Sequence, residues 1–186
     1  MPRAGLDPDR VVRAAADLVD DVGHDQLTLA AVAAHFDVAV PSLYKHVGGI
    51  DDLHGRLAVL AVEELGARLA AAAGGPHAGD EPFRTLARAY RAYAVEHPGR
   101  YAATVRAPGP DDVALRAASD AVLSTVLAVL GDLGLTGDDA VDAARAVRSA
   151  LHGFVTLEAA GGFGLPRDVD RSFTSLVDTL HRGLLA

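Results

Sequence analysis

The chain is predicted to be an all-α protein, and three observations lead to that prediction. Apolar residues recur at steps of three and four, the spacing of one helix face. Alanine and leucine dominate, aromatic residues make up only 5% of the 186 residues, and valines cluster inside helical patterns. No segment alternates apolar and polar residues long enough to indicate a strand. Half of the residues are hydrophobic, so a sizeable core is available. About nine helices are expected.

The first helix is expected to begin at Asp7 and end at Gly23. Asp7 is a suitable N-cap, and Pro8 suits the first helical position, where its missing N–H would have no partner. Gly23 is a typical helix stop. The apolar stripe of this helix consists of Val11, Ala15, Leu18, Val19 and Val22.

The next segment is predicted to form a short helix followed by a tight turn. Thr28 can cap the helix through its hydroxyl group. Asp37 follows as the turn residue, because Asp tolerates left-handed geometry better than most residues other than glycine. The apolar face of this helix consists of Leu29, Val32, Ala33 and Phe36.

A third short helix is expected to follow, with Pro41 in its first turn. Only Leu43 and Val47 are clearly apolar in it, four residues apart, so its other side chains would face outward. The two helices and their turn read as a helix-turn-helix whose second helix offers hydrogen-bond donors to a DNA groove. The outward residues are Ser42, Tyr44, Lys45 and His46.

The remaining helices are separated by segments rich in glycine and proline, which stop helices. The clearest break is 72–79, and others lie at 97–99, 108–110 and 161–162. The expected helices cover roughly 51–73, 80–97, 111–133, 138–160 and 170–185, with a short piece at 100–106.

Two stretches resemble the TetR family of bacterial transcriptional repressors. The run Ser-Leu-Tyr-Lys-His-Val at 42–47 is similar to the family's recognition helix, and residues 7–23 resemble its first helix. Residues 151–163 are similar to the ligand-domain signature of a subgroup named for a Trp-His-Gly tripeptide, with Leu151 in place of Trp. The resemblance implies a helix-turn-helix DNA-binding domain at 6–52 and a ligand-binding and dimerisation domain at 53–186. It also implies a repressor that binds a palindromic operator and is released by a small-molecule effector.

Three positions depart from the family pattern. Asp37 stands where the family usually has glycine, and Ala39 stands where a serine often caps the recognition helix. Ile50 replaces a lysine that commonly touches a DNA phosphate. Backbone N–H groups near Gly48 and Gly49 are a candidate replacement for that phosphate contact.

The candidate DNA-binding residues come from the predicted helix-turn-helix. Tyr44 suits a phosphate or a thymine methyl group, although packing against the preceding helix is the alternative. Lys45 suits a phosphate, because cations near DNA serve affinity more than sequence. His46 has capping of its helix as an equal alternative. The candidates are Thr28, Val40, Pro41, Ser42, Tyr44, Lys45 and His46.

The net charge of −8 argues at first sight against nucleic-acid binding, since DNA-binding domains usually carry a basic surface. We therefore expect a local arrangement, with Asp17 and Asp20 turned away from the duplex and Arg3 and Lys45 facing it. An acidic body would also reduce non-specific DNA binding.

The family resemblance further implies a ligand cavity in the second domain. Tyr90, Tyr93 and His97 recur at helical steps, and such a stripe is equally compatible with ordinary core packing. An apolar or aromatic ligand is expected, with polar groups facing His97 or Arg106. The candidate ligand-binding residues are Tyr90, Tyr93, His97, Tyr101, Arg106, Phe154, Leu157 and Glu158.

The helices at 138–160 and 170–185 carry long apolar faces. One small domain is not expected to hide both, and exposed apolar stripes usually mark interfaces. The resemblance implies a two-fold homodimer through these helices.

Enzymatic and metal-binding classes find no support. There is no Gly-x-Ser-x-Gly, no His-Glu-x-x-His, no phosphate loop and no cysteine. No catalytic residue, metal or cofactor is therefore expected. The absence of a signal-peptide pattern or an apolar run of 18 residues favours a cytoplasmic protein without a membrane segment. Two alternatives stay open: an all-α small-molecule-binding or enzymatic bundle without DNA binding, and a pure interaction module.

Overall fold

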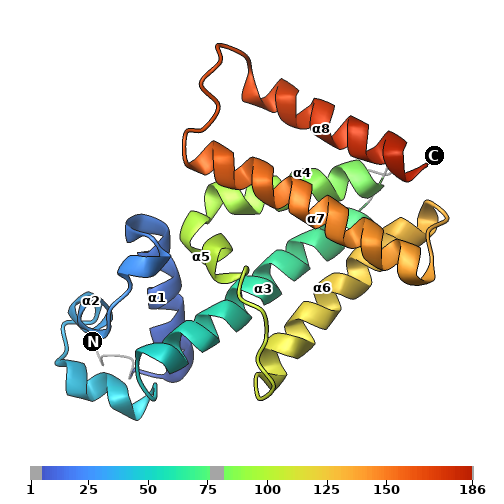
Figure 1. The fold of residues 1–186 in the computed structure, drawn as a ribbon. Coiled ribbons are helices and arrows are strands. Elements are labelled where there is room, and N and C mark those ends of the chain that lie inside the picture. The colour runs from blue at the N-terminus through green and yellow to red at the C-terminus, as the bar shows by residue number, and fades with distance from the viewer. Residues whose placement is uncertain (1–5, 76–81, 186) are drawn as a thin grey trace. The chain divides into compact units, whose positions relative to one another are not determined.

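The computed structural model describes residues 6–75 and 82–185, and every regular element among them is helical (Figure 1). This confirms the all-α fold class. The α-helices are α1 (Pro8–Val22), α2 (Leu29–His35), α3 (Ile50–Gly74), α4 (Pro82–Glu96), α5 (Pro98–Ala103), α6 (Val113–Asp132), α7 (Gly137–Ala159) and α8 (Val169–Leu184). Two 3-10 helices complete the set, η1 (His24–Gln26) and η2 (Val40–Lys45).

The expected start and stop signals of the first helices are confirmed. The Asp7 carboxylate accepts a hydrogen bond from the Arg10 amide at 2.9 Å, which caps α1. Gly23 ends α1 with a φ of 93°. The Thr28 hydroxyl accepts a hydrogen bond from the Ala31 amide at 3.1 Å. Asp37 has a φ of 54°, so it adopts the left-handed conformation that the turn requires.

Two elements differ from their prediction. Residues 40–45 form a 3-10 helix, because the segment is too short to settle into several α turns. The short helix after α4 begins at Pro98 rather than Arg100, since a proline is well placed at the first helical position. The expected helix start near Asp80 lies outside the described residues.

The chain forms two compact units, each made of two segments. The first contains residues up to Glu64 and residues 97–118. Its core is built by α1, α2, η2, α5 and the first half of α3. The largest fully buried apolar side chains there are Val11, Val19, Val32, Leu43, Leu53 and Leu57.

Helices α1 and α5 approach closely inside the first unit. A Cβ atom added at Gly99 would lie 1.9 Å from the carbonyl oxygen of Val19, so only glycine fits there. This contact joins segments that are far apart in the sequence. The domain boundary expected at residue 52 separates a DNA-binding domain from a ligand-binding domain. The compact units have different boundaries, because α5 packs on α1 and so belongs to the first unit.

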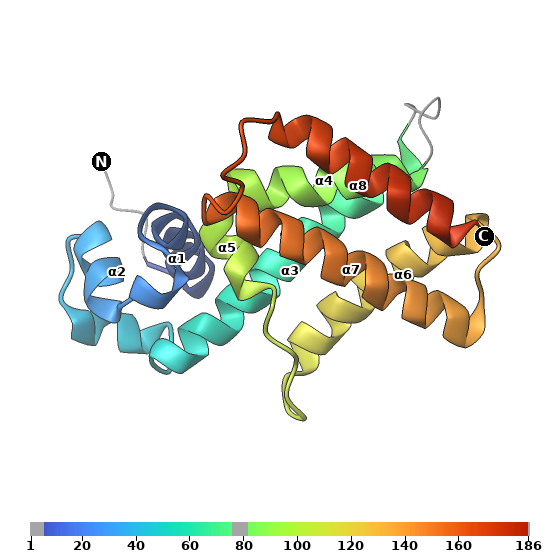
Figure 2. The ribbon, with the colours of Figure 1, turned by 45° about the horizontal axis from the view of Figure 1, so that its top comes forward.

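The second unit contains residues 65–96 and 119–186, and α4, α7 and α8 pack against one another in it (Figure 2). The apolar faces expected to remain exposed on α7 and α8 are largely buried, because α4 covers much of both. The buried members are Ala144, Val147, Leu151, Phe154, Val155, Phe173 and Val177. Val141, Leu176, Leu180 and Leu184 are only partly buried.

One described helix, α6, is long and apolar enough to cross a membrane, with a mean hydropathy of 1.7 over its most apolar window. The sequence contains no uninterrupted apolar run there, because Arg116 and Asp120 lie within the helix. Length and composition alone are weak evidence, since helices of soluble proteins meet the same criteria.

Candidate DNA-binding and ligand-binding residues

The predicted DNA-reading segment has one buried and one exposed side. Leu43 is 0% exposed and Val47 is 2% exposed, and both belong to the core of the first unit. Tyr44, between them, is 59% exposed, although aromatic residues usually bury their rings. The buried side chains therefore hold η2 against the core, and the polar residues of η2 face solvent.

The other candidates on this segment also reach solvent. Thr28, Pro41 and Lys45 are exposed, and Val40, Ser42 and His46 are partly exposed. No described residue forms an ion pair with Lys45, so its charge is available for a phosphate. The hydroxyl of Thr28 already accepts the Ala31 amide, which still leaves its O–H free to donate.

One backbone group near the start of α3 is not available for the phosphate contact considered from the sequence. The amide of Gly48 donates to the Asp52 carboxylate at 2.8 Å, so Asp52 occupies it. Arg56 donates to the same carboxylate at 3.0 Å. The hydrogen bond from Gly48, followed by that from Arg56, lowers the pKa of Asp52. Asp52 thus stabilises the beginning of α3, as the acidic residues at the start of this helix lead one to expect from the helix dipole.

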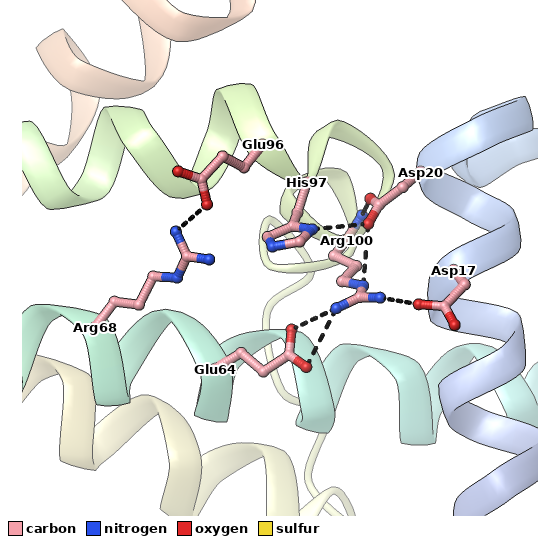
Figure 3. Close-up of polar contacts among 7 residues, drawn as sticks. All are labelled: Asp17, Asp20, Glu64, Arg68, Glu96, His97 and Arg100. Atoms are coloured by element: carbon pink, nitrogen blue, oxygen red, sulfur yellow. Dashed lines mark hydrogen bonds and ion pairs between the residues drawn. The ribbon is translucent and has the colours of Figure 1, made fainter.

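A partly buried arginine, Arg100, holds α5 against α1 and α3 within the first unit (Figure 3). The Arg100 guanidinium is 14% exposed and forms ion pairs with Asp17, with Asp20 at 3.0 Å and with Glu64 at 3.3 Å. The carboxylate of Asp20 also accepts the Arg100 backbone amide at 2.9 Å. The carboxylates of Asp17 and Asp20 are therefore engaged by Arg100. Their orientation relative to a DNA duplex stays a prediction, as does the DNA contact of Arg3, which lies outside the described residues.

Three of the ligand candidates belong to the first unit. Nδ1 of His97 lies 3.0 Å from an Asp20 oxygen, as Figure 3 shows. Arg106 is exposed and pairs with Asp112 at 2.7 Å. Tyr101 is 7% exposed. The two polar ligand handles considered from the sequence, His97 and Arg106, are thus already engaged by carboxylates.

The other five candidates belong to the second unit, where an arginine joins two of them. Arg91 donates to Glu158 at 2.8 and 2.5 Å, and its guanidinium lies 5.8 Å from the Phe154 ring centroid. The hydrogen bond to Glu158, then that to Asp170, holds the pKa of Arg91 above its ordinary value. Phe154 is also in ring contact with Phe173.

The remaining candidates of the second unit differ in exposure. Tyr93 is 0% exposed and its ring lies 5.4 Å from the Arg68 guanidinium, which itself pairs with Glu96 at 2.5 Å (Figure 3). Tyr90 is 8% exposed, whereas Leu157 is 51% exposed. Tyr90, Tyr93 and Phe154 thus form the buried aromatic part of the candidates in the second unit.

Comparison with known protein families identifies the C-terminal half of the chain. A model described as "Tetracyclin repressor-like, C-terminal domain" matches residues 83–180, slightly more than half of the sequence.

Individual proteins agree with that family over nearly the whole chain. An uncharacterised HTH-type transcriptional regulator of Mycobacterium tuberculosis is 38% identical over 97% of this chain and 83% of its own length. A crystal structure from Streptomyces coelicolor, described as a possible TetR family transcriptional regulator, is 25% identical with a TM-score of 0.74, covering 96% of this chain and 98% of that one. ActR of the same organism, solved in complex with (S)-DNPA, shares the fold with a TM-score of 0.72 at 20% identity, covering 98% of each chain.

Proposed function

Because the chain belongs to the TetR family of transcriptional regulators, we propose that it represses transcription by binding operator DNA through η2 and releases that DNA when a small molecule binds. The observation that carries the DNA-binding part is the arrangement around Leu43 and Tyr44. A buried leucine anchors the segment, and the next side chain is held in solvent. A core-anchored helix with exposed polar residues is the arrangement that major-groove reading needs.

The contacts proposed for DNA divide into two kinds. Lys45 and Thr28 are proposed to contact phosphates, which supply affinity without sequence information. The remaining candidates are proposed to lie against base edges or the adjoining DNA backbone. They are Val40, Pro41, Ser42, Tyr44 and His46. Replacement of the family's usual lysine by Ile50 removes one phosphate contact, so we expect affinity to depend strongly on Lys45.

The proposed operator is a palindrome and the proposed binding form is a homodimer in the cytoplasm. Two copies related by a two-fold axis present two η2 segments, so half-sites near one helical turn apart, or somewhat more, are expected. Helices α7 and α8 are the proposed dimer contacts, through their partly buried residues and the exposed Leu157.

The proposed effector is a small, largely apolar or aromatic molecule. ActR, with the same fold, holds (S)-DNPA, which supports a ligand-binding role for the helices outside the DNA-reading segment. Tyr90, Tyr93 and Phe154 are the proposed apolar lining, because they are buried and their aromatic rings offer stacking surfaces. Glu158, His97 and Arg106 already have charged partners, so a strongly charged ligand there would have to displace them.

The test of DNA binding uses the complete chain and the DNA segment upstream of its own coding sequence. An electrophoretic mobility shift is expected at low salt, and the double variant Tyr44→Ala/Lys45→Ala should abolish it. Both side chains are exposed, so the variant should keep its helical circular dichroism. A shift that the double variant retains would place DNA contact elsewhere on the molecule.

A further inference from the structure

A groove between α4 and α8 in the second unit gathers arginine residues on a chain whose net charge is −8. The groove has a volume of about 390 Å³, within the range of small-molecule sites. Its lining consists of Arg84, Arg171, Thr174, Ser175, Asp178 and Arg182.

The groove follows from the spacing of residues on α8. Positions 171, 174, 175, 178 and 182 are separated by steps of three and four, which places them on one side of the helix. Phe173 and Val177, on the neighbouring side, are buried and hold α8 in the unit. The polar side of α8 therefore faces the groove along about three turns, and Arg84 of α4 completes the groove.

Only part of the positive charge in the groove is neutralised. Arg84 forms an ion pair with Asp178. Arg182 donates through Nε to the backbone carbonyl of Asp178 at 3.3 Å, and no described carboxylate pairs with it. Arg171 has no hydrogen-bond or ion-pair partner among the described residues. The guanidinium groups of Arg171 and Arg182 thus have no carboxylate partner among the described residues.

The chemistry of the groove selects its ligand. Guanidinium groups present paired N–H donors that match the oxygens of phosphate and carboxylate groups. Ser175 and Thr174 add hydroxyl groups, of which Thr174 uses its donor on the Asp170 carbonyl oxygen at 2.9 Å. A cation would be repelled, and an apolar molecule would leave the arginine donors unpaired. We propose that this groove binds a small molecule carrying phosphate or carboxylate groups, with Arg171 and Arg182 as its main contacts.

The proposed anion groove is independent of DNA binding. Every lining residue lies on α4 or α8, and none belongs to the candidates for DNA or effector contact. The groove can therefore be tested whether or not the protein binds an operator.

The experiment measures thermal unfolding and isothermal titration of the complete chain with sodium pyrophosphate and, separately, with sodium succinate. Sodium chloride at equal ionic strength is the reference. We expect saturable binding of at least one of the two anions, accompanied by a rise in Tm, because a ligand of the folded state stabilises it. Preference for pyrophosphate would indicate a phosphate ligand, and preference for succinate a carboxylate.

Single substitutions identify the site. Arg171→Gln and Arg182→Gln should each weaken binding about tenfold, the worth of one charge-assisted hydrogen bond. Arg148→Gln is the matched control, because it removes the same charge from an exposed position of α7 outside the groove. All three residues are exposed, so the variants should unfold at the temperature of the parent without anion.

Two results would overturn the proposal. One is that neither anion binds more tightly than chloride. The other is that Arg148→Gln weakens binding as much as the groove variants do, which would reveal a general charge effect.

Discussion

Adjacent residues in η2 have opposite environments, and this division assigns them different tasks. Leu43 is fully buried and Tyr44 is more than half exposed, so we expect a change at Leu43 to alter stability and a change at Tyr44 to alter the proposed DNA recognition. Lys45 is exposed as well, and its flexible cation suits a phosphate better than a base.

The first prediction separates phosphate contact from base contact. Lys45→Ala should weaken binding to all DNA sequences about equally and reduce the salt slope by roughly one unit. Tyr44→Ala should instead change which sequences are preferred. Fluorescence anisotropy with a panel of duplexes at several salt concentrations measures both. An unchanged affinity of Lys45→Ala at low salt would contradict the proposed placement of η2.

The second prediction concerns a histidine pair in the first unit. The rings of His24 and His54 lie 4.7 Å apart, with Asp25 and Asp51 as the acidic groups acting on His54. Burial, followed by the charge of His24, lowers the pKa of His54 from 6.5. The unfolded chain then binds more protons than the folded chain as pH drops below 6.5. The free energy of unfolding should therefore fall as the pH drops below 6.5. The fall should end once the pH is below the pKa of His54 in the folded protein.

Urea unfolding at a series of pH values tests this. His54→Gln should flatten the decline below pH 6.5, whereas His35→Gln, at an exposed position, should leave it unchanged. An identical slope in His54→Gln and the parent would show that other groups cause the decline.

The contact of α1 with α5 leaves no room for a side chain at Gly99. The backbone of Gly99 lies against Val19, and Arg100 beside it binds carboxylates of α1 and α3. Gly99→Ala should destabilise the protein by more than about 2 kcal/mol, because the added methyl group meets backbone rather than a movable side chain. Gly131→Ala, with no atom within 4 Å of the new methyl group, should be neutral or stabilising by up to about 1 kcal/mol. Chemical denaturation compares the two, and equal effects would mean that α5 can move away from α1.

Local signals in the sequence predicted the helices well, because caps and stops act within a few residues. Asp7, Thr28 and Gly23 perform the roles expected of them. The Arg100 ion pairs could not be predicted, since they join α5 to residues between 36 and 83 positions earlier and no local pattern records such a partner. The burial of the α7 and α8 faces was missed for the same reason, as it depends on where α4 packs. The contacts of η2 with DNA remain predictions.

For the whole molecule, the main prediction is self-association. Sedimentation velocity at micromolar concentration should show a homodimer. Leu157→Lys should shift it toward monomer, because Leu157 is the large apolar residue that α7 leaves most exposed. Because the Leu157 side chain is exposed in the single subunit, Leu157→Lys should hardly change the stability of that subunit. Leu123→Lys on α6, also exposed, is the control. A parent protein that sediments as a monomer would refute the dimer.

The pairing of α5 with α1 also determines when the first unit can form during synthesis. Asp17 leaves the ribosome 83 residues before Arg100, its partner. Through that interval the nascent α1 has no neighbour for its Val19 backbone, and two of its carboxylates lack their cation. The proposed DNA-reading segment is thus translated early, but the helix that completes its unit is translated later. A truncated product ending near residue 64 would contain every proposed DNA contact and still lack the helix that completes the unit around them.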